Sequence, residues 1–72
     1  MYGPFERFAP PQAVPPFRVQ YFCPRQSRFW QGGGFAFWNY VDACMEAQIL
    51  LPNSPDGHAR VLDARNVVIY EI

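Results

Sequence analysis

The chain has 72 residues, of which half are hydrophobic and 18% are aromatic, and its formal net charge at pH 7 is zero. A chain of this length has room for one domain, which buries only about 60% of its unfolded surface. The balanced charge argues against the strongly basic field that draws proteins to nucleic acid or anionic membranes. All six basic residues are arginines, which excludes Schiff-base lysine chemistry and a P-loop lysine.

Residues 1–16 contain five of the eight prolines in the chain. Paired prolines favour extended polyproline II geometry over a helix or a central strand. Tyr2, Phe5 and Phe8 recur every three residues, so they lie on one side of such an extended segment. The sequence therefore predicts a proline-rich N-terminal arm whose rings either fold back onto the domain's own sheet or dock on a partner.

The segment that follows, residues 17–72, is predicted to be a small α+β domain. "FRVQYF" alternates between two faces, as a half-buried strand does, and "RFWQ" returns as the second strand of a hairpin. The first face takes Phe17, Val19 and Tyr21, and the second takes Arg18, Gln20 and Phe22.

A helix is predicted to begin at Tyr40, because Asn39 has the side chain of an N-cap and Asp42 suits the first turn. Pro52 and "NSPDG" end this helix after Leu51, because proline cannot continue it and Asp-Gly is a strong turn signal. One stripe of the helix is predicted to face the sheet: Tyr40, Ala43, Cys44, Ala47, Leu50 and Leu51.

Glycines 32–34, just before this helix, raise the question of a phosphate-binding loop. Phe35 follows where a Walker loop has lysine, and "GGGFAFWN" lacks the third glycine of a dinucleotide fingerprint. We therefore interpret the three glycines as a flexible turn or wide bulge that lets bulky neighbours point to opposite sides of the sheet.

Two further strands are predicted in "ARVLD" and "NVVIYEI", joined by a turn in which Asp63 and Asn66 are the favoured residues. The expected order is β-β-α-β-β, an antiparallel sheet with one helix packed on one face. If "NVVIYEI" lies at a sheet edge, it can accept another strand, including one from a second copy of the chain.

Catalytic and metal-binding groups are scarce. His58 is the only histidine and is expected as a solvated residue of the turn beside Gly57. One histidine and two separated cysteines do not make a zinc site, and Cys44 lies on the predicted buried stripe, where a thiol is inert. We expect no catalytic residue, cofactor or metal.

Cys23 and Cys44 are too few for the disulfide framework of a small secreted domain, so we expect both as buried apolar side chains. Whether they approach within bonding reach stays open at this stage. "MYGPFERFAP" carries an acid and an arginine where a signal peptide needs an apolar core, and no long apolar run follows. A cytoplasmic protein without a membrane span is expected.

The aromatic residues exceed what one short helix can cover, because neighbours along a strand alternate between faces. Exposed aromatic and arginine side chains are typical anchors of protein interfaces. The sequence thus predicts a non-enzymatic interaction module, an adaptor, subunit or inhibitor that binds a larger protein. A single-stranded nucleic-acid binder is the alternative, and a small enzyme ranks third. The expected partner-binding residues are Tyr2, Phe5, Phe8, Arg28, Trp30, Trp38 and Tyr70.

Overall fold

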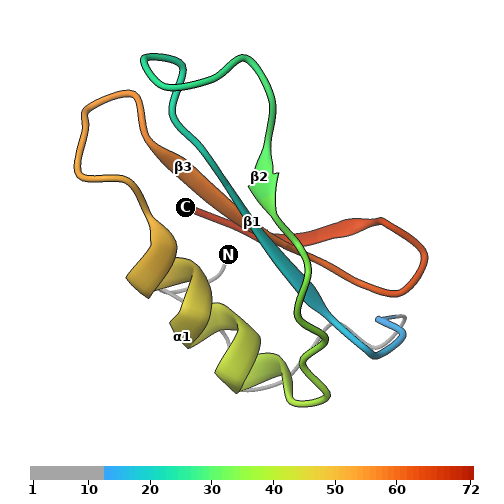
Figure 1. Cartoon of the computed structure of the whole chain (residues 1–72). Coiled ribbons are helices and arrows are strands. Elements are labelled where there is room, and N and C mark those ends of the chain that lie inside the picture. The colour runs from blue at the N-terminus through green and yellow to red at the C-terminus, as the bar shows by residue number, and fades with distance from the viewer. Residues whose placement is uncertain (1–12) are drawn as a thin grey trace.

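A computed structural model describes residues 13–72, and within them the predicted β-β-α-β-β order is confirmed (Figure 1). The fold is a small α+β domain with one four-stranded antiparallel sheet and one helix. Its elements are β1 (Arg18–Phe22), β2 (Gln31–Gly32), α1 (Tyr40–Leu50), β3 (His58–Leu62) and β4 (Val68–Glu71). His58, expected in a turn, is instead the exposed first residue of β3.

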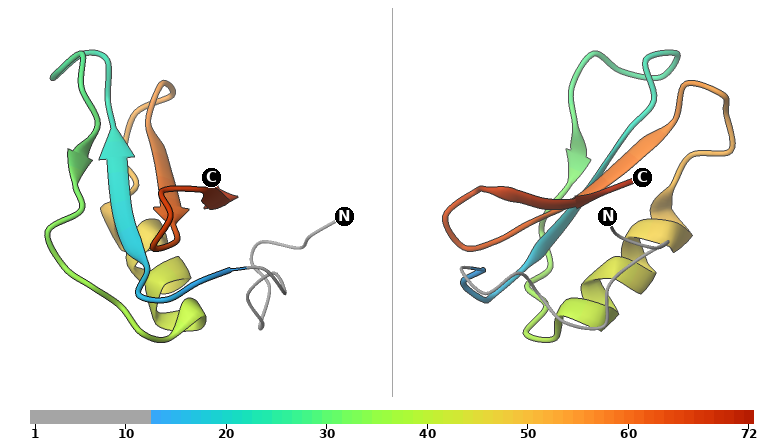
Figure 2. Two further views of the ribbon diagram at one scale, coloured as in Figure 1. Left: turned by 90° about the vertical axis from the view of Figure 1, so that its right-hand side faces the viewer. Right: turned by 180° about the vertical axis from the view of Figure 1, so that it is seen from behind.

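The sheet has the strand order β2-β1-β3-β4, and all three neighbouring pairs are antiparallel. β1 and β3 form the centre, where Val19 pairs with Val61 and Gln20 pairs with Arg60. The last strand, β4, lies at an edge of this sheet. The sheet is twisted, and α1 covers one of its faces against β1 and β3 (Figure 2).

The N-terminus of the helix is where the sequence places it. The Asn39 side chain accepts hydrogen bonds from the main-chain N–H groups of Val41 and Asp42, at 2.8 and 3.3 Å. Such a cap satisfies donors that have no partner within the helix. The predicted C-terminus is wrong by one residue, because Leu51 lies after the last helical residue and is 38% exposed.

The core lies between α1 and the sheet, and the predicted alternation of β1 is confirmed, since Phe17 and Val19 are buried and Tyr21 is half-buried. The buried helix positions are Tyr40, Ala43, Cys44 and Ala47. Two of these are alanines with no exposed surface, so the helix backbone packs close to the sheet. The sheet contributes Val19, Ala59, Val61 and Tyr70 to the same cluster, together with Phe17, which immediately precedes β1.

The second strand is shorter than the predicted "RFWQ" because only Gln31 and Gly32 pair with β1. The Ser27 hydroxyl accepts hydrogen bonds from the Phe29 main chain and the Gln31 side chain, which bends the chain before the strand. Gly32 and Gly33 then adopt φ values of 82° and 93°. These values favour glycine, in agreement with the interpretation of a turn or bulge.

The turn between β3 and β4 is organised by a buried carboxylate, that of Asp63. Its oxygens accept hydrogen bonds from the N–H groups of Val14, Arg65 and Val67 and from the Arg65 guanidinium. Burial alone would raise the pKa of Asp63, but these donors together lower it below its usual value. Asn66 completes the turn at φ 65°, the left-handed geometry expected for it.

Asp63 also fixes the chain that leads into β1. Val14 donates to Asp63 Oδ2 at 3.2 Å, and the Val14 carbonyl accepts from the Ala64 N–H at 2.7 Å. The described end of the predicted arm, residues 13–16, is therefore held against the β3–β4 turn. The rest of the predicted arm lies outside the described residues.

Replacing Ala47 with Asp should lower the free energy of unfolding by about 3 kcal/mol or more, because the new carboxylate has no partner in the core. The matched control is Gln48→Asp, one residue further along α1 and exposed, which should change stability by under about 0.5 kcal/mol. Urea unfolding followed by circular dichroism measures both. Equal stability of the two variants would contradict the assigned helix face.

Asp63→Asn should lower the melting temperature at pH 7, because an amide has one acceptor oxygen where the carboxylate has two and brings N–H donors toward other donors. A lowered folded-state pKa gives stability that is present above the unfolded-state pKa and is lost as the pH falls through the folded-state value. The difference in melting temperature between the two proteins should therefore narrow from about pH 4 downward. A difference that stays constant from pH 7 to pH 2 would contradict the role of the charge.

Candidate functional site: the open face of the sheet

The face of the sheet opposite α1 carries a cluster of two aromatic rings, an arginine and a glutamine. The rings of Phe22 and Trp30 lie 5.4 Å apart, centroid to centroid, and are tilted by 34°. The Arg60 guanidinium carbon lies 3.9 Å from the Trp30 ring centroid. We call Gln20, Phe22, Trp30 and Arg60 the aromatic–arginine cluster.

Strand alternation and register bring these residues together. Gln20 and Phe22 are two apart on β1, so they share the face that Val19 and Tyr21 do not occupy. Arg60 is the direct cross-strand partner of Gln20. Trp30 immediately precedes β2. The cluster therefore spans three neighbouring segments of the chain.

Hydrogen bonds hold Arg60 in place over the indole ring. Its Nε and Nη2 atoms donate to Gln20 Oε1 at 3.0 and 2.8 Å. A guanidinium over an indole face contributes about 0.5–1 kcal/mol at an exposed site and more when a partner excludes water. Because all four side chains are only half-buried, the cluster is both ordered and open to contact.

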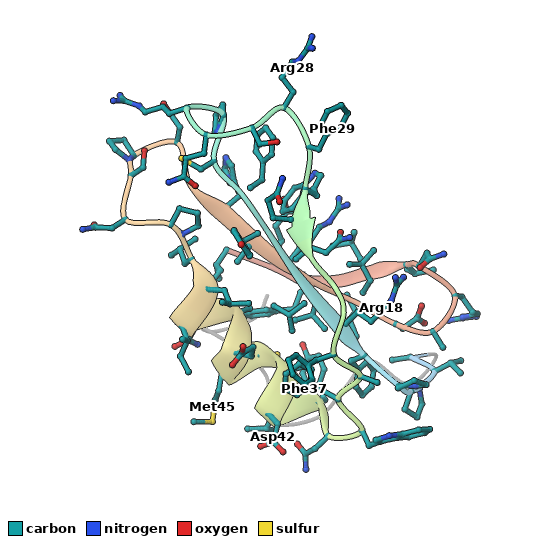
Figure 3. The ribbon with its side chains drawn as sticks, viewed as in Figure 1. Arg18, Arg28, Phe29, Phe37, Asp42 and Met45 are labelled. Atoms are coloured by element: carbon teal, nitrogen blue, oxygen red, sulfur yellow. The ribbon has the colours of Figure 1, made fainter. Side chains whose placement is uncertain are left out.

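The predicted partner-binding residues are not gathered in one place. Trp30 belongs to the aromatic–arginine cluster. Arg28 is exposed in the β1–β2 connection, and Trp38 is 73% exposed just before α1 (Figure 3 labels Arg28). Tyr2, Phe5 and Phe8 lie outside the described residues.

Tyr70 corrects one part of the prediction. Its side chain is only 8% exposed and packs in the core cluster under α1, because alternation along β4 turns it to the covered face. A partner approaching the open face does not meet this ring.

The sequence analysis did not select Gln20 or Arg60 as site residues. Neither is aromatic, and their importance comes from the β1–β3 register, which puts one opposite the other. The available signal was the alternation of "FRVQYF", which already placed Gln20 and Phe22 on the same face.

Further exposed apolar side chains lie away from the cluster. Phe29 and Phe35 are 70% and 79% exposed, and Met45 and Ile49 lie on the outer side of α1. Figure 3 shows Phe29 beside Arg28 at the end of the molecule opposite Met45. For Phe29, Phe35, Met45 and Ile49 no ring contact with another described residue holds the side chain, whereas Trp30 contacts both Phe22 and Arg60.

Both thiols are buried and free, so Cys23 and Cys44 form no disulfide. Burial raises the pKa of Cys44, although a hydrogen bond with Tyr40 opposes that rise. Within residues 13–72, no three His, Cys, Asp or Glu side chains gather where they could hold a metal ion.

Comparison with known protein families, with curated proteins and with solved structures found no match. In the part of the chain that the structure describes, no helix has the length and apolar character to cross a membrane. What the open face does must therefore be argued from its own geometry.

Proposed function

We propose that this chain is a non-enzymatic interaction module that binds a larger protein through the open face of its sheet. The observation that carries the proposal is the fixed position of Trp30, which contacts Phe22 and lies under an Arg60 guanidinium that Gln20 orients. Trp and Arg are enriched among the residues that dominate binding energy in protein interfaces. An anchor that is ordered before binding loses little side-chain entropy on association.

The scarcity of reactive groups supports a binding role over catalysis. Cys44 is buried with a raised pKa, and the solitary His58 is exposed at one end of β3. Neither is in the position of an activated nucleophile or its base.

Single-stranded nucleic acid is the second candidate, since the Trp30 ring and the Arg60 guanidinium could together hold a stacked base. The zero net charge favours a protein partner, because neutralisation of phosphates supplies much of the affinity for nucleic acid. A third arrangement is a homodimer in which the edge strand β4 of one copy pairs with that of another.

Trp30→Ala should abolish capture of a partner when the tagged full chain is exposed to nuclease-treated extract of its own cells, because loss of a central interface tryptophan costs about 2 kcal/mol or more. The matched control is Met45→Ala, which removes an exposed apolar side chain from the opposite side of the molecule. Proteins retained by the wild type and by Met45→Ala, but not by Trp30→Ala, are the expected result.

Circular dichroism melting must show that both variants are folded at the capture temperature. Retention of the same proteins by wild type and Trp30→Ala would contradict the proposal. If the wild-type chain captures proteins from untreated extract but not from nuclease-treated extract, the nucleic-acid candidate is favoured.

A fluorescent single-stranded oligonucleotide should show no association with the wild-type chain in physiological salt, as judged by fluorescence anisotropy. The reason is that the chain has zero net charge and so lacks the excess of positive charge that neutralises phosphates. Micromolar or tighter binding that falls as salt rises and weakens in Trp30→Ala would reverse the order of the two candidates.

A further inference from the structure

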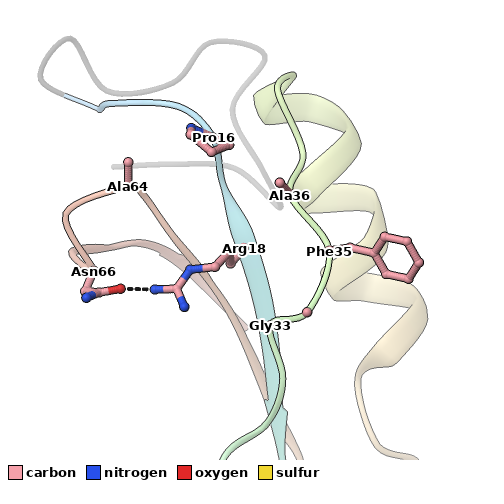
Figure 4. Close-up of a pocket in the computed structure, with 8 residues that line it drawn as sticks. Pro16, Arg18, Gly33, Phe35, Ala36, Ala64 and Asn66 are labelled. Atoms are coloured by element: carbon pink, nitrogen blue, oxygen red, sulfur yellow. Dashed lines mark hydrogen bonds between the residues drawn. The ribbon is translucent and has the colours of Figure 1, made fainter.

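A cavity of about 370 Å³ lies between the start of β1, the β3–β4 turn and the segment that follows β2. Figure 4 shows Arg18 reaching across it toward Asn66, while the Phe35 ring points away from Arg18. Its lining residues are Pro16, Arg18, Gly33, Gly34, Phe35, Ala36, Ala64 and Asn66.

The cavity exists because the chain leaves β1 after β2 and rejoins it before α1. Gln20 pairs with Gly32, so continuous pairing would place Phe35 opposite Phe17. Phe37 is there instead and exchanges two main-chain hydrogen bonds with Phe17, at 2.6 and 2.8 Å. The two extra residues bulge away from β1 and open the space beside Arg18.

Three lining residues have main-chain N–H groups without a partner among the described residues. The main-chain N–H groups of Gly34, Phe35 and Ala36 take part in no hydrogen bond with residues 13–72. Arg18 Nη2 donates to the Asn66 side-chain oxygen, which orients the guanidinium and leaves its other N–H groups available.

Arg18 also has no acidic partner among residues 13–72. In the described part of the chain, no carboxylate lies within ion-pairing distance of Arg18, whereas Arg25 pairs with Asp56 and Arg65 pairs with Asp63. A half-buried guanidinium beside main-chain N–H donors is a receptor for an anion, and a planar carboxylate can take two of its N–H groups at once.

The charged residues of the two faces of the sheet bear on which ligand this cavity would take. Arg18 and Arg60 lie on the open face, since both alternate with buried core residues, and Arg60 too has no carboxylate within ion-pairing distance among residues 13–72. The exposed Glu71 is the cross-strand partner of Arg60 on β4, so the open face also carries one carboxylate beside Arg60. Asp42 and Glu46 are on α1, which covers the opposite face. Glu71 offsets the charge of Arg60, whereas the cross-strand partner of Arg18 is the apolar Leu62, so it is the cavity at Arg18 that favours an acidic ligand.

We propose that the cavity at Arg18 binds an aspartate or glutamate side chain of the partner polypeptide, next to the contact that the partner makes with the aromatic–arginine cluster. This inference rests on the proposed function and specifies its partner as an acidic protein segment. The Arg18 guanidinium pairs with the carboxylate, and the N–H groups of the bulged segment bind the oxygen that remains.

The experiment titrates the ¹⁵N-labelled full chain with short peptides and follows main-chain amide signals by NMR. The probe is acetylated and amidated Phe-Glu-Phe. Its controls are the same peptide with Gln in place of Glu, the Gln peptide with a free C-terminal carboxylate, and inorganic phosphate. We expect the Glu peptide to shift Gly34 and Ala36 more than any of the three controls does.

Arg18→Gln should weaken binding of the Glu peptide by about tenfold or more, because a charge-assisted hydrogen bond is lost. Arg25→Gln removes an exposed arginine of the β1–β2 connection and should leave binding unchanged. Asn66→Gly removes the hydrogen bond that orients Arg18, at a φ that suits glycine, but keeps the guanidinium charge, so it should weaken binding less than Arg18→Gln does.

Equal shifts by the Glu and Gln peptides would overturn the proposal, as would an equal loss in Asn66→Gly and Arg18→Gln. Stronger shifts of the same amides by phosphate or by the free C-terminus would also overturn it, since another anion would then be the better fit. The Trp30 indole signal reports on the proposed function separately. If the peptides shift this signal but not Gly34, the open face binds while the cavity does not.

Discussion

One helix of 11 residues has to cover a four-stranded sheet, and it covers only one face. On that face, Ala43 and Ala47 bring the helix close to the central strands, and the buried side chains of β1 and β3 fill the space between. Among residues 13–72 no helix covers the opposite face, and side chains of that face contact one another. The pairing of Gln20 with Arg60 and the contact of Arg60 with Trp30 follow from that constraint.

Asp63 links this sheet to the chain that enters it. A carboxylate removed from water is stable as an anion only when donors surround it, and here the donors come from residue 14 and from the turn itself. The same arrangement positions Asn66, whose side chain orients Arg18. The structural turn and the cavity on the open face are therefore connected through one short segment.

The glycine-rich segment also has two consequences. Its positive φ values let the chain turn away from β1, and its missing side chains leave room beside Arg18. On the other side of the same segment, a second cavity of about 240 Å³ is lined by apolar residues of β1 and α1 with Glu46 as its one carboxylate. The three successive glycines before α1 thus line two cavities, one with the cation Arg18 and the other with the carboxylate Glu46. A phosphate-binding loop would not lead one to expect this arrangement.

The sequence by itself determined the element order, the cap at Asn39 and the covered face of β1, because these depend on local chemistry and on the two-residue period of a strand. It also indicated that aromatic side chains would exceed what one helix covers. Only the tertiary structure decided that Trp30 joins Arg60 while Trp38 stays apart, and that Tyr70 is buried. Those outcomes depend on the register between strands distant in sequence, which a local pattern does not specify.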